Sequence, residues 1–216
     1  MSSKVNLSQI RNEYKNKSFN ESVAKANPLE QFQIWFDEML NSEFVEPTAM
    51  ILATSTKEGN PNARVVLLKQ YDEQGFVFFT NYESQKGIEI EQNPRGCLLF
   101  YWDKLARQVR INGKIEKISK EESENYFDTR PYTSRLGAWA SKQSKPLRSR
   151  FTLIREVVKM MGKYPVKVPL PPFWGGYRLI PYQYEFWQGR ENRLHDRLQY
   201  LKSQSSDEWI ITRLYP

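Results

Sequence analysis

The 216 residues are 39% hydrophobic and 14% aromatic, which suits one globular domain with a substantial core. Lysine and arginine outnumber aspartate and glutamate by 32 to 25, and the net charge of +7 favours anionic partners without choosing among nucleic acid, membranes and small phosphates. One histidine and one cysteine cannot build a zinc site from the usual ligands, so no metal is expected.

The N-terminal segment is polar. Residues 1–26 contain few apolar anchors, and we expect a mobile arm that orders on a ligand. No stretch has the apolar length of a signal peptide or a membrane span, which predicts a cytoplasmic protein with no membrane partner. Residues 27–216 are expected to form a single domain.

The first half of the chain alternates short strands with turns. Pro28 opens an amphipathic helix that faces a core. A short helix over 84–92 has Ser84 as its N-cap, and its first-turn amides suit an anion. Strands rich in β-branched and aromatic residues are expected at 48–56, 63–69, 76–80, 96–102 and 107–118.

The second half returns to strands after a helical stretch. Helices are expected over 120–127 and 147–161, with a polar loop region between them. Four prolines make 165–172 an extended crossover. Strands are expected around 174–178 and at 182–188, 197–202 and 209–214. Many short strands with helices around them indicate a mainly β, antiparallel barrel with peripheral helices.

The single histidine lies between two arginines near the C-terminus. On a β-strand, the spacing of two places Arg193, His195 and Arg197 on one side, as a cationic face that can titrate. Guanidinium groups bind phosphate or carboxylate bidentately and stack on rings, and Trp187 adds a flat surface, so the pattern suits an aromatic anion. A solvated surface strand explains the same pattern, and the residues alone leave both interpretations open.

Two further sets of polar residues suit an anion. Arg64 and Lys69 end an apolar strand, and strict alternation places them on opposite faces. Either both are solvated, or a bend or a subunit interface brings both to ligands. Tyr126, Arg130 and Ser134 recur at intervals of four, but a proline at 131 predicts a helix end followed by a loop. Such a loop presents groups to a phosphate, although a capped helix terminus accounts for it equally.

Taken in order along the chain, several short sequence segments resemble the pyridoxine (pyridoxamine) 5′-phosphate oxidase family. The matching segments cover nearly the whole chain and are 11–14, 64–69, 141–144, 173–176, 186–189 and 193–197. The resemblance implies an antiparallel Greek-key flavin split barrel (FMN-binding split barrel) that forms a homodimer, with two FMN molecules in clefts where the subunits meet. It also implies oxidation of pyridoxamine and pyridoxine 5′-phosphates to pyridoxal 5′-phosphate in vitamin B6 metabolism, with O2 as acceptor and H2O2 as product.

The resemblance also implies roles for individual residues. The expected FMN contacts are Arg64, Val65, Val66, Leu67, Leu68, Lys69, Phe79, Thr80, Lys86, Gln108, Gln143, Ser144, Trp187 and Arg197. The substrate phosphate is expected at Lys69, Tyr126, Arg130 and Ser134. Arg193 and His195 are the expected catalytic residues, placed at the pyridine ring and its reacting carbon. Arg11 and Tyr14 are expected to close over the substrate as a lid.

Two positions depart from the family pattern. Gln85 stands where an arginine is common beside Lys86, so one cation of the FMN phosphate site is absent. A charge-assisted hydrogen bond contributes about 1.5 to 3 kcal/mol, so we expect weaker flavin binding unless another group compensates. Phe79 replaces a frequent tyrosine, which changes little if that contact runs through the backbone.

Two other functions remain as alternatives. Another split-barrel FMN-dependent oxidoreductase would act on a different small molecule, and fold analogy does not exclude it. A non-enzymatic nucleic-acid-binding protein would account for the basic charge and the aromatic residues. Its basic residues, however, are dispersed along the chain.

Overall fold

The computed structural model describes residues 18–216, and they group into two compact units. Unit 1 holds residues 18–47, 100–110 and 183–216, and unit 2 holds 48–99 and 111–182. The expected lid residues Arg11 and Tyr14 lie outside the described residues. This grouping leaves the expectation of one domain over 27–216 untested, since three strands contribute residues to both units.

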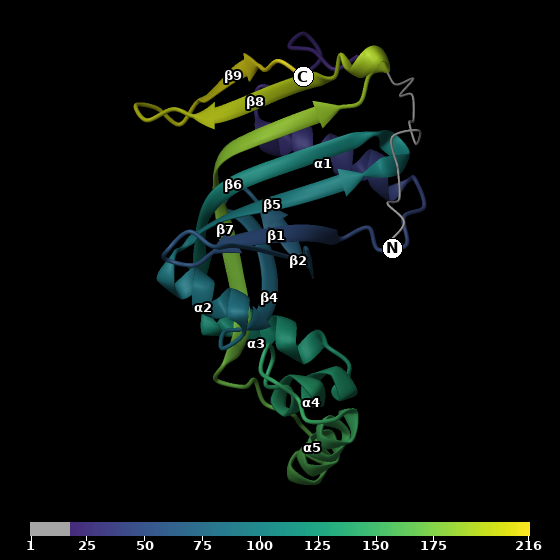
Figure 1. Ribbon diagram of the computed structural model, residues 1–216, viewed down its shortest axis with the longest axis vertical. Helices are drawn as coiled ribbons and strands as arrows, with labels where there is room; N and C mark the ends of the chain where they lie inside the picture. Colours follow the sequence, from purple (N-terminus) through teal and green to yellow (C-terminus); the bar gives the residue numbers. More distant parts are fainter. Residues whose placement is uncertain (1–17) are drawn as a thin grey trace, which may run out of the picture. The chain divides into compact units, whose positions relative to one another are not determined.

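The elements alternate along the chain much as the sequence indicates (Figure 1). The helices are α1 (Pro28–Leu40), α2 (Gln85–Gln92), α3 (Lys120–Thr129), α4 (Tyr132–Ala140) and α5 (Arg150–Lys163). The strands are β1 (Ala49–Ser55), β2 (Pro61–Leu67), β3 (Gln70–Asp72), β4 (Gly75–Asn81), β5 (Arg95–Trp102), β6 (Arg107–Lys117), β7 (Trp174–Gln188), β8 (Asp196–Lys202) and β9 (Trp209–Arg213). The two strands expected on either side of residue 180 are one strand, β7.

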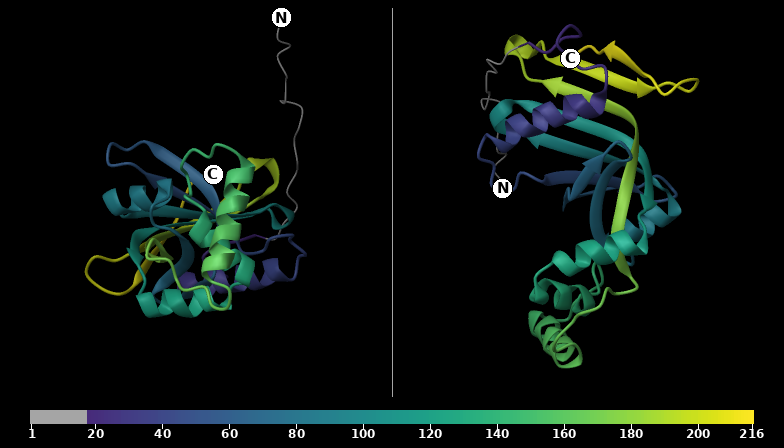
Figure 2. Two further views of the ribbon diagram at one scale, coloured as in Figure 1. Left: turned by 90° about the horizontal axis from the view of Figure 1, so that it is seen from below. Right: turned by 180° about the vertical axis from the view of Figure 1, so that it is seen from behind.

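The core of unit 1 is aromatic. Asn27 caps α1 by accepting the Leu29 N–H, and the helix covers one face of the strand segments of this unit (Figure 2, right). Phe32 meets Phe100 edge to face at 5.1 Å between ring centroids. In the same unit, β8 pairs antiparallel with both β7 and β9. Edge-to-face rings add stabilisation beyond their buried area.

The segment before α1 contacts unit 1 through Phe19. Phe19 is buried, its ring lies 4.8 Å from that of Trp35, and its backbone N–H donates to Asp196 at 3.0 Å. One buried aromatic ring offsets the ordering entropy of a few polar residues. These contacts attach Phe19 to unit 1, and the mobility expected over 1–26 stays a prediction.

The strands of unit 2 belong to one sheet, in which the strand order is β2-β1-β5-β6-β7-β4-β3. β1 pairs with β2 and with β5, while β4 pairs with β3 and with β7. Every one of these pairings is antiparallel, so the strands behave as the turn-rich sequence predicts. Ser84 caps α2 as expected, with its hydroxyl accepting the Gly87 N–H.

The expected loop between α3 and α5 is instead a helix, α4, which lies beside α5 (Figure 1). Pro131 ends the first helical course and serves as the N-cap of the second, where the N–H it lacks is not required. Leu136 is fully buried in a cluster with Phe127 and Trp174. Burial of this apolar residue outweighs the polar composition that predicted a loop.

Candidate functional site

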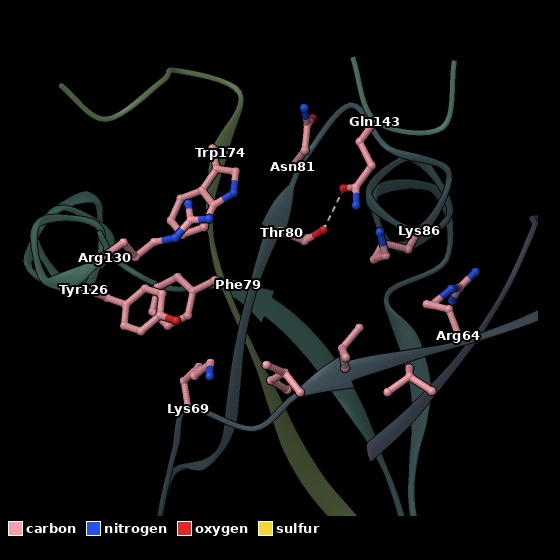
Figure 3. A pocket seen from close by; sticks show the side chains of 13 residues that line it. Arg64, Lys69, Phe79, Thr80, Asn81, Lys86, Tyr126, Arg130, Gln143 and Trp174 are labelled. Carbon is pink, nitrogen blue, oxygen red and sulfur yellow. Dashed lines mark hydrogen bonds between the residues drawn. The ribbon is translucent and has the colours of Figure 1, made fainter. Parts of the chain in front are cut away.

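A pocket of about 520 Å³ opens in unit 2 (Figure 3). This volume lies within the range typical of small-molecule sites. It is lined by Arg64, Val65, Val66, Leu67, Lys69, Phe79, Thr80, Asn81, Lys86, Tyr126, Arg130, Gln143 and Trp174. Eleven of these thirteen residues are predicted site residues; Asn81 and Trp174 are not.

Arg64 and Lys69 line the same pocket although strict strand alternation separates them. β2 ends at Leu67, and the chain changes its pairing partner immediately afterwards. The Leu68 N–H donates to Thr48 before β1, whereas the Lys69 N–H donates to Val77 in β4. The alternation argument therefore stops at Leu67, and the bend accounts for the shared pocket. Leu68 is buried and does not line the pocket.

One end of the pocket carries Arg64 and Lys86 (Figure 3). Lys86 is only 7% exposed, lies in the first turn of α2, and donates from Nζ to the Ser84 hydroxyl at 3.3 Å. Burial and then the neighbouring Arg64 charge lower the pKa of Lys86, while Glu89 opposes this shift. Two cations beside a helix N-terminus make this end suited to an anion.

The other end carries Arg130 and Lys69 (Figure 3). The guanidinium carbon of Arg130 lies 4.7 Å from the Trp174 ring centroid, and its NH1 is buried without a hydrogen-bond partner among the described residues. Burial lowers the pKa of Arg130. A buried donor without a partner is costly, which indicates that a ligand acceptor belongs here.

Aromatic rings line the pocket beside Arg130. Phe79 stacks on Tyr126 at 3.8 Å between centroids, and Trp174 lies parallel to both rings. The Phe79 side chain therefore lies at the pocket, at the position where the resemblance implies a frequent tyrosine. Burial raises the pKa of Tyr126, so its hydroxyl is a neutral donor at pH 7.

Polar side chains close the remaining wall. The Thr80 hydroxyl donates to Gln143 Oε1 at 3.3 Å, and Asn81 Nδ2 donates to the Ser141 carbonyl at 3.5 Å. Asn81 directly follows Thr80, the last residue of a predicted strand. This position at a strand end is the sequence signal that could have identified Asn81 as a site residue. Trp174 lies in the matching segment 173–176, but nothing in its pattern distinguished ligand contact from core packing.

The remaining predicted residues of the C-terminal segment belong to unit 1. Arg193 and His195 do not lie on a strand, because residues 191–193 form a 3₁₀ turn and β8 begins at Asp196. Asn192 and Arg193 have φ values of 55° and 60°, in the left-handed region. The predicted single cationic strand face is therefore wrong. Arg193 is exposed at the tip of this turn.

His195 is held beside Trp187. Their ring centroids are 4.7 Å apart, and the Arg190 N–H donates to His195 Nδ1 at 3.1 Å. This bond places the proton of the neutral imidazole on Nε2. Burial and then the Arg193 charge lower the pKa of His195 below 6.5, so the ring is neutral at pH 7.

Arg197 lies opposite Trp187 in the β7–β8 ladder, so the two side chains share one face. Its Nε and NH2 donate to Glu185 Oε1 at 3.0 and 2.8 Å, and NH1 donates to the Tyr215 carbonyl. Glu185 is buried and also pairs with Arg110. The carboxylate thus fixes Arg197 in place.

Three other predicted residues fall outside the described lining of the pocket. Ser134 lies in α4, Gln108 lies in the part of β6 that belongs to unit 1, and Ser144 follows the lining residue Gln143 with a φ of 68°. Their proposed ligand contacts stay predictions.

Residues 18–216 contain neither a grouped metal site nor a membrane-spanning helix. No three histidine, cysteine, aspartate or glutamate side chains in this part of the chain are grouped as a metal site. None of its helices has the length and apolar character needed to cross a bilayer.

The sequence matches two family models. Residues 36–161 match the model described as pyridoxamine 5′-phosphate oxidase, and residues 174–216 match the pyridoxine 5′-phosphate oxidase C-terminal dimerisation region. Pyridoxine/pyridoxamine 5′-phosphate oxidase of Gloeothece citriformis is 50% identical over 97% of this chain and 98% of its own length. That of Bordetella pertussis is 51% identical over 98% of this chain and 100% of its own length.

Two solved structures share the fold. PhzG from Burkholderia lata, in complex with tetrahydrophenazine-1-carboxylic acid, has a TM-score of 0.87 and 28% identity, covering 95% of this chain and all of that one. A pyridoxamine 5′-phosphate oxidase-related, FMN binding protein from Nostoc punctiforme has a TM-score of 0.70 and 19% identity, covering 88% and 98%. These likenesses confirm the predicted split-barrel fold.

Proposed function

This chain belongs to the pyridoxamine 5′-phosphate oxidase family, and we propose that it oxidises pyridoxamine and pyridoxine 5′-phosphates to pyridoxal 5′-phosphate. The family membership confirms the resemblance drawn from the sequence. Oxygen is the proposed electron acceptor, and the proposed role is in vitamin B6 metabolism.

The cofactor is FMN, and the pocket residues fit it. The phosphate is assigned to Arg64 and Lys86, beside the first turn of α2, where two cations and backbone amides meet a dianion. The apolar residues 65–67 suit the face of a flat heterocycle, and Gln143 and Thr80 offer hydrogen bonds to its polar edge.

The observation that carries the proposal is the presence of two separated cation pairs in one pocket. Arg64 and Lys86 lie at one end, and Lys69 and Arg130 lie at the other (Figure 3). One phosphorylated ligand needs one such pair. The second pair, with a buried NH1 on Arg130 that has no partner within the described chain, supports a second phosphorylated ligand, the substrate.

The substrate phosphate is accordingly assigned to Lys69, Arg130 and Tyr126. Ser134 remains part of this proposal as a residue of the neighbouring helix α4. FMN held here would supply the redox chemistry as acceptor of a hydride equivalent from the substrate carbon, and O2 would be reduced to H2O2. The amine substrate would also take up water and lose ammonia to give the aldehyde. The protein's task is to hold the carbon and the flavin face to face.

Arg193 and His195 are proposed to bind the pyridine ring. Arg193 is exposed on a turn, and among residues 18–216 no acidic side chain pairs with it, so its guanidinium is available to clamp a substrate. His195 is proposed to orient the substrate, because its imidazole is held against Trp187 and by the Arg190 N–H. Arg11 and Tyr14 complete the proposal as the lid.

We place each site between two copies of the chain. The matched dimerisation region, residues 174–216, contains Trp187, Arg193, His195 and Arg197. In the proposed homodimer this region of one copy faces the pocket of its partner. Trp187 and Arg197, together with Gln108, Ser144 and the backbone of Leu68, then complete the FMN contacts.

Oxygen consumption with pyridoxamine 5′-phosphate tests the proposed function. Purified protein is expected to be yellow, to release FMN on denaturation, and to form the aldehyde product as oxygen disappears. Protein that binds FMN but consumes no oxygen with either B6 phosphate would contradict the proposal. Colourless protein with steeply salt-dependent nucleic-acid binding would favour the non-enzymatic alternative.

The structural likeness to PhzG favours one second candidate. That protein was solved with tetrahydrophenazine-1-carboxylic acid, an aromatic anion without a phosphate. A carboxylate can bind Arg130 and Lys69 as well. Oxidation of such a compound in preference to the B6 phosphates would assign this chain to the alternative substrate class.

A further inference from the structure

We propose that Glu89 is a positioning residue for FMN, because its buried carboxylate orients the Arg64 guanidinium toward the flavin phosphate. Glu89 lies on α2 and is only 1% exposed. It does not line the pocket, so it acts through Arg64. The inference rests on the proposed placement of the FMN phosphate at Arg64 and Lys86.

Both oxygens of Glu89 are occupied by neighbouring donors. Oε1 accepts from Asn62 Nδ2 at 2.5 Å and from Gln85 Nε2 at 2.9 Å. Oε2 accepts from the Thr54 hydroxyl and from Arg64 NH2, the latter at 3.2 Å. These donors come from β1, β2 and α2, so the carboxylate ties three elements together behind the phosphate end of the pocket.

Arg64 is held on one edge and open on the other. Its NH1 donates to the Leu52 carbonyl at 3.2 Å and to the Thr54 hydroxyl at 2.5 Å, and its NH2 donates once, to Glu89. Its Nε–H and the second NH2 hydrogen have no hydrogen-bond partner among residues 18–216. That pair of parallel donors matches the bidentate geometry of a phosphate.

The Glu89 charge affects the site in two opposing ways. It reduces the net positive potential that attracts a dianion, and it stabilises two cations that otherwise repel each other across the empty site. Burial raises the pKa of Glu89, but hydrogen bonds from Thr54 and Gln85 and the Arg64 charge outweigh burial and lower it, so the group is ionised at pH 7. We expect the orienting effect to outweigh the loss of positive potential, because a free guanidinium must lose rotamer freedom when it binds the phosphate.

Flavin binding to the apoprotein tests the inference without any substrate. Dissociation constants for FMN and for riboflavin, which lacks the phosphate, are measured by fluorescence quenching. Glu89→Gln is expected to weaken FMN binding about tenfold or more, because an amide presents only one acceptor oxygen to four donors. Riboflavin affinity is expected to stay at the wild-type value.

Two controls separate positioning from general damage to the fold. Glu91→Gln alters an exposed glutamate of the same helix, paired with Lys117 at 3.1 Å, and is expected to leave both affinities unchanged. Asn62→Ala loosens Glu89 without altering its charge and is expected to cause a smaller loss that is again confined to FMN. If Glu89→Gln does not fold, Asn62→Ala still tests the inference.

The inference fails if Glu89→Gln leaves FMN affinity unchanged or increases it, or if FMN and riboflavin affinities fall together. It also fails if Glu89→Gln weakens FMN equally in an Arg64→Ala background, since Glu89 would then act without Arg64. Wild-type protein that binds no FMN would overturn the proposed function as well. Normal wild-type binding with an unaffected variant would overturn this inference alone.

Discussion

At the scale of the residue, Arg193 carries the clearest prediction about catalysis. Arg193→Ala is expected to leave FMN bound and to lower kcat/KM on the order of a hundredfold, because the side chain is proposed to hold only the substrate ring in attack geometry. Arg193→Lys should restore little, because an ammonium does not reproduce a planar clamp. Steady-state kinetics with measured flavin content are the test. Unchanged kinetics in Arg193→Ala would remove this residue from the site.

Substitutions at Lys69 and Arg130 should impair the reaction of phosphorylated substrates more than that of unphosphorylated ones. Arg130→Ala removes a charge-assisted contact of about 2 kcal/mol, which corresponds to a loss of roughly 30-fold in kcat/KM for pyridoxamine 5′-phosphate. Lys69→Ala should show the same selectivity. The unphosphorylated amine, assayed in parallel, should lose little. Equal losses for the ester and the free amine would argue against the phosphate role.

His195 is the only histidine, so its titration can be followed without assignment by proton NMR. Its pKa in the folded apoprotein is expected below 6.5, from burial and then from the Arg193 charge. A lowered pKa means that the unfolded chain binds the proton more readily. The stabilisation from this group is therefore complete above pH 6.5 and is lost as pH falls through the folded pKa. In Arg193→Ala the pKa should rise; a wild-type value above 6.5 would contradict the geometry.

Several residues named by the family resemblance lie together in the structure, while their contacts with ligands stay predictions. Arg64, Lys69, Tyr126 and Arg130 line one pocket, as the family resemblance implied. The prediction that Arg193 and His195 share one strand face was wrong, because the left-handed backbone at residues 192 and 193 breaks the strand. Neither residue is glycine, so no composition signal marked that turn.

At the scale of the element, the position of α2 depends on close packing of Gly87 against the backbone of Tyr82, which precedes the helix. A Cβ at Gly87 would lie 2.0 Å from the Tyr82 carbonyl oxygen. Gly87→Ala should displace the helix that carries Lys86, lower the free energy of unfolding by about 1 to 3 kcal/mol, and weaken FMN binding. Urea denaturation and flavin titration measure both effects.

Gly162→Ala is the matched control within a helix. Within residues 18–216, no atom apart from the adjacent residues and backbone of its own helix lies within 4 Å of a Cβ at Gly162. Alanine there should therefore stabilise α5 by about 0.5 to 1 kcal/mol through its helix propensity. If Gly87→Ala behaved like Gly162→Ala, the close packing of α2 would not matter for the site.

Elements with periodic apolar residues were predictable, and α4 was not. Pro131 was correctly taken as the end of a helix, but a proline also begins one. The burial of Leu136 against Phe127 and Trp174 decides between loop and helix, and it joins residues nearly forty positions apart. Sequence periodicity over nine residues does not contain that information.

At the scale of the whole molecule, the proposed homodimer makes a prediction about mixed subunits. Arg130→Ala and Arg193→Ala are each expected to be impaired as pure dimers. If each site takes Arg130 from one copy and Arg193 from the other, mixed dimers contain one intact site and one with both changes. Mixing followed by subunit exchange should then restore about a quarter of wild-type activity at equal proportions, by random pairing of the proposed dimer. No recovery after verified exchange would place both residues on the same copy.

Anaerobic reduction of the bound flavin tests the central claim most directly. Adding pyridoxamine 5′-phosphate without oxygen is expected to bleach the oxidised flavin absorbance, and admitting O2 should restore it with release of pyridoxal 5′-phosphate and H2O2. Tetrahydrophenazine-1-carboxylic acid should bleach it far more slowly. A flavin that stays oxidised with both B6 phosphates, or that is reduced faster by the phenazine compound, would contradict this account.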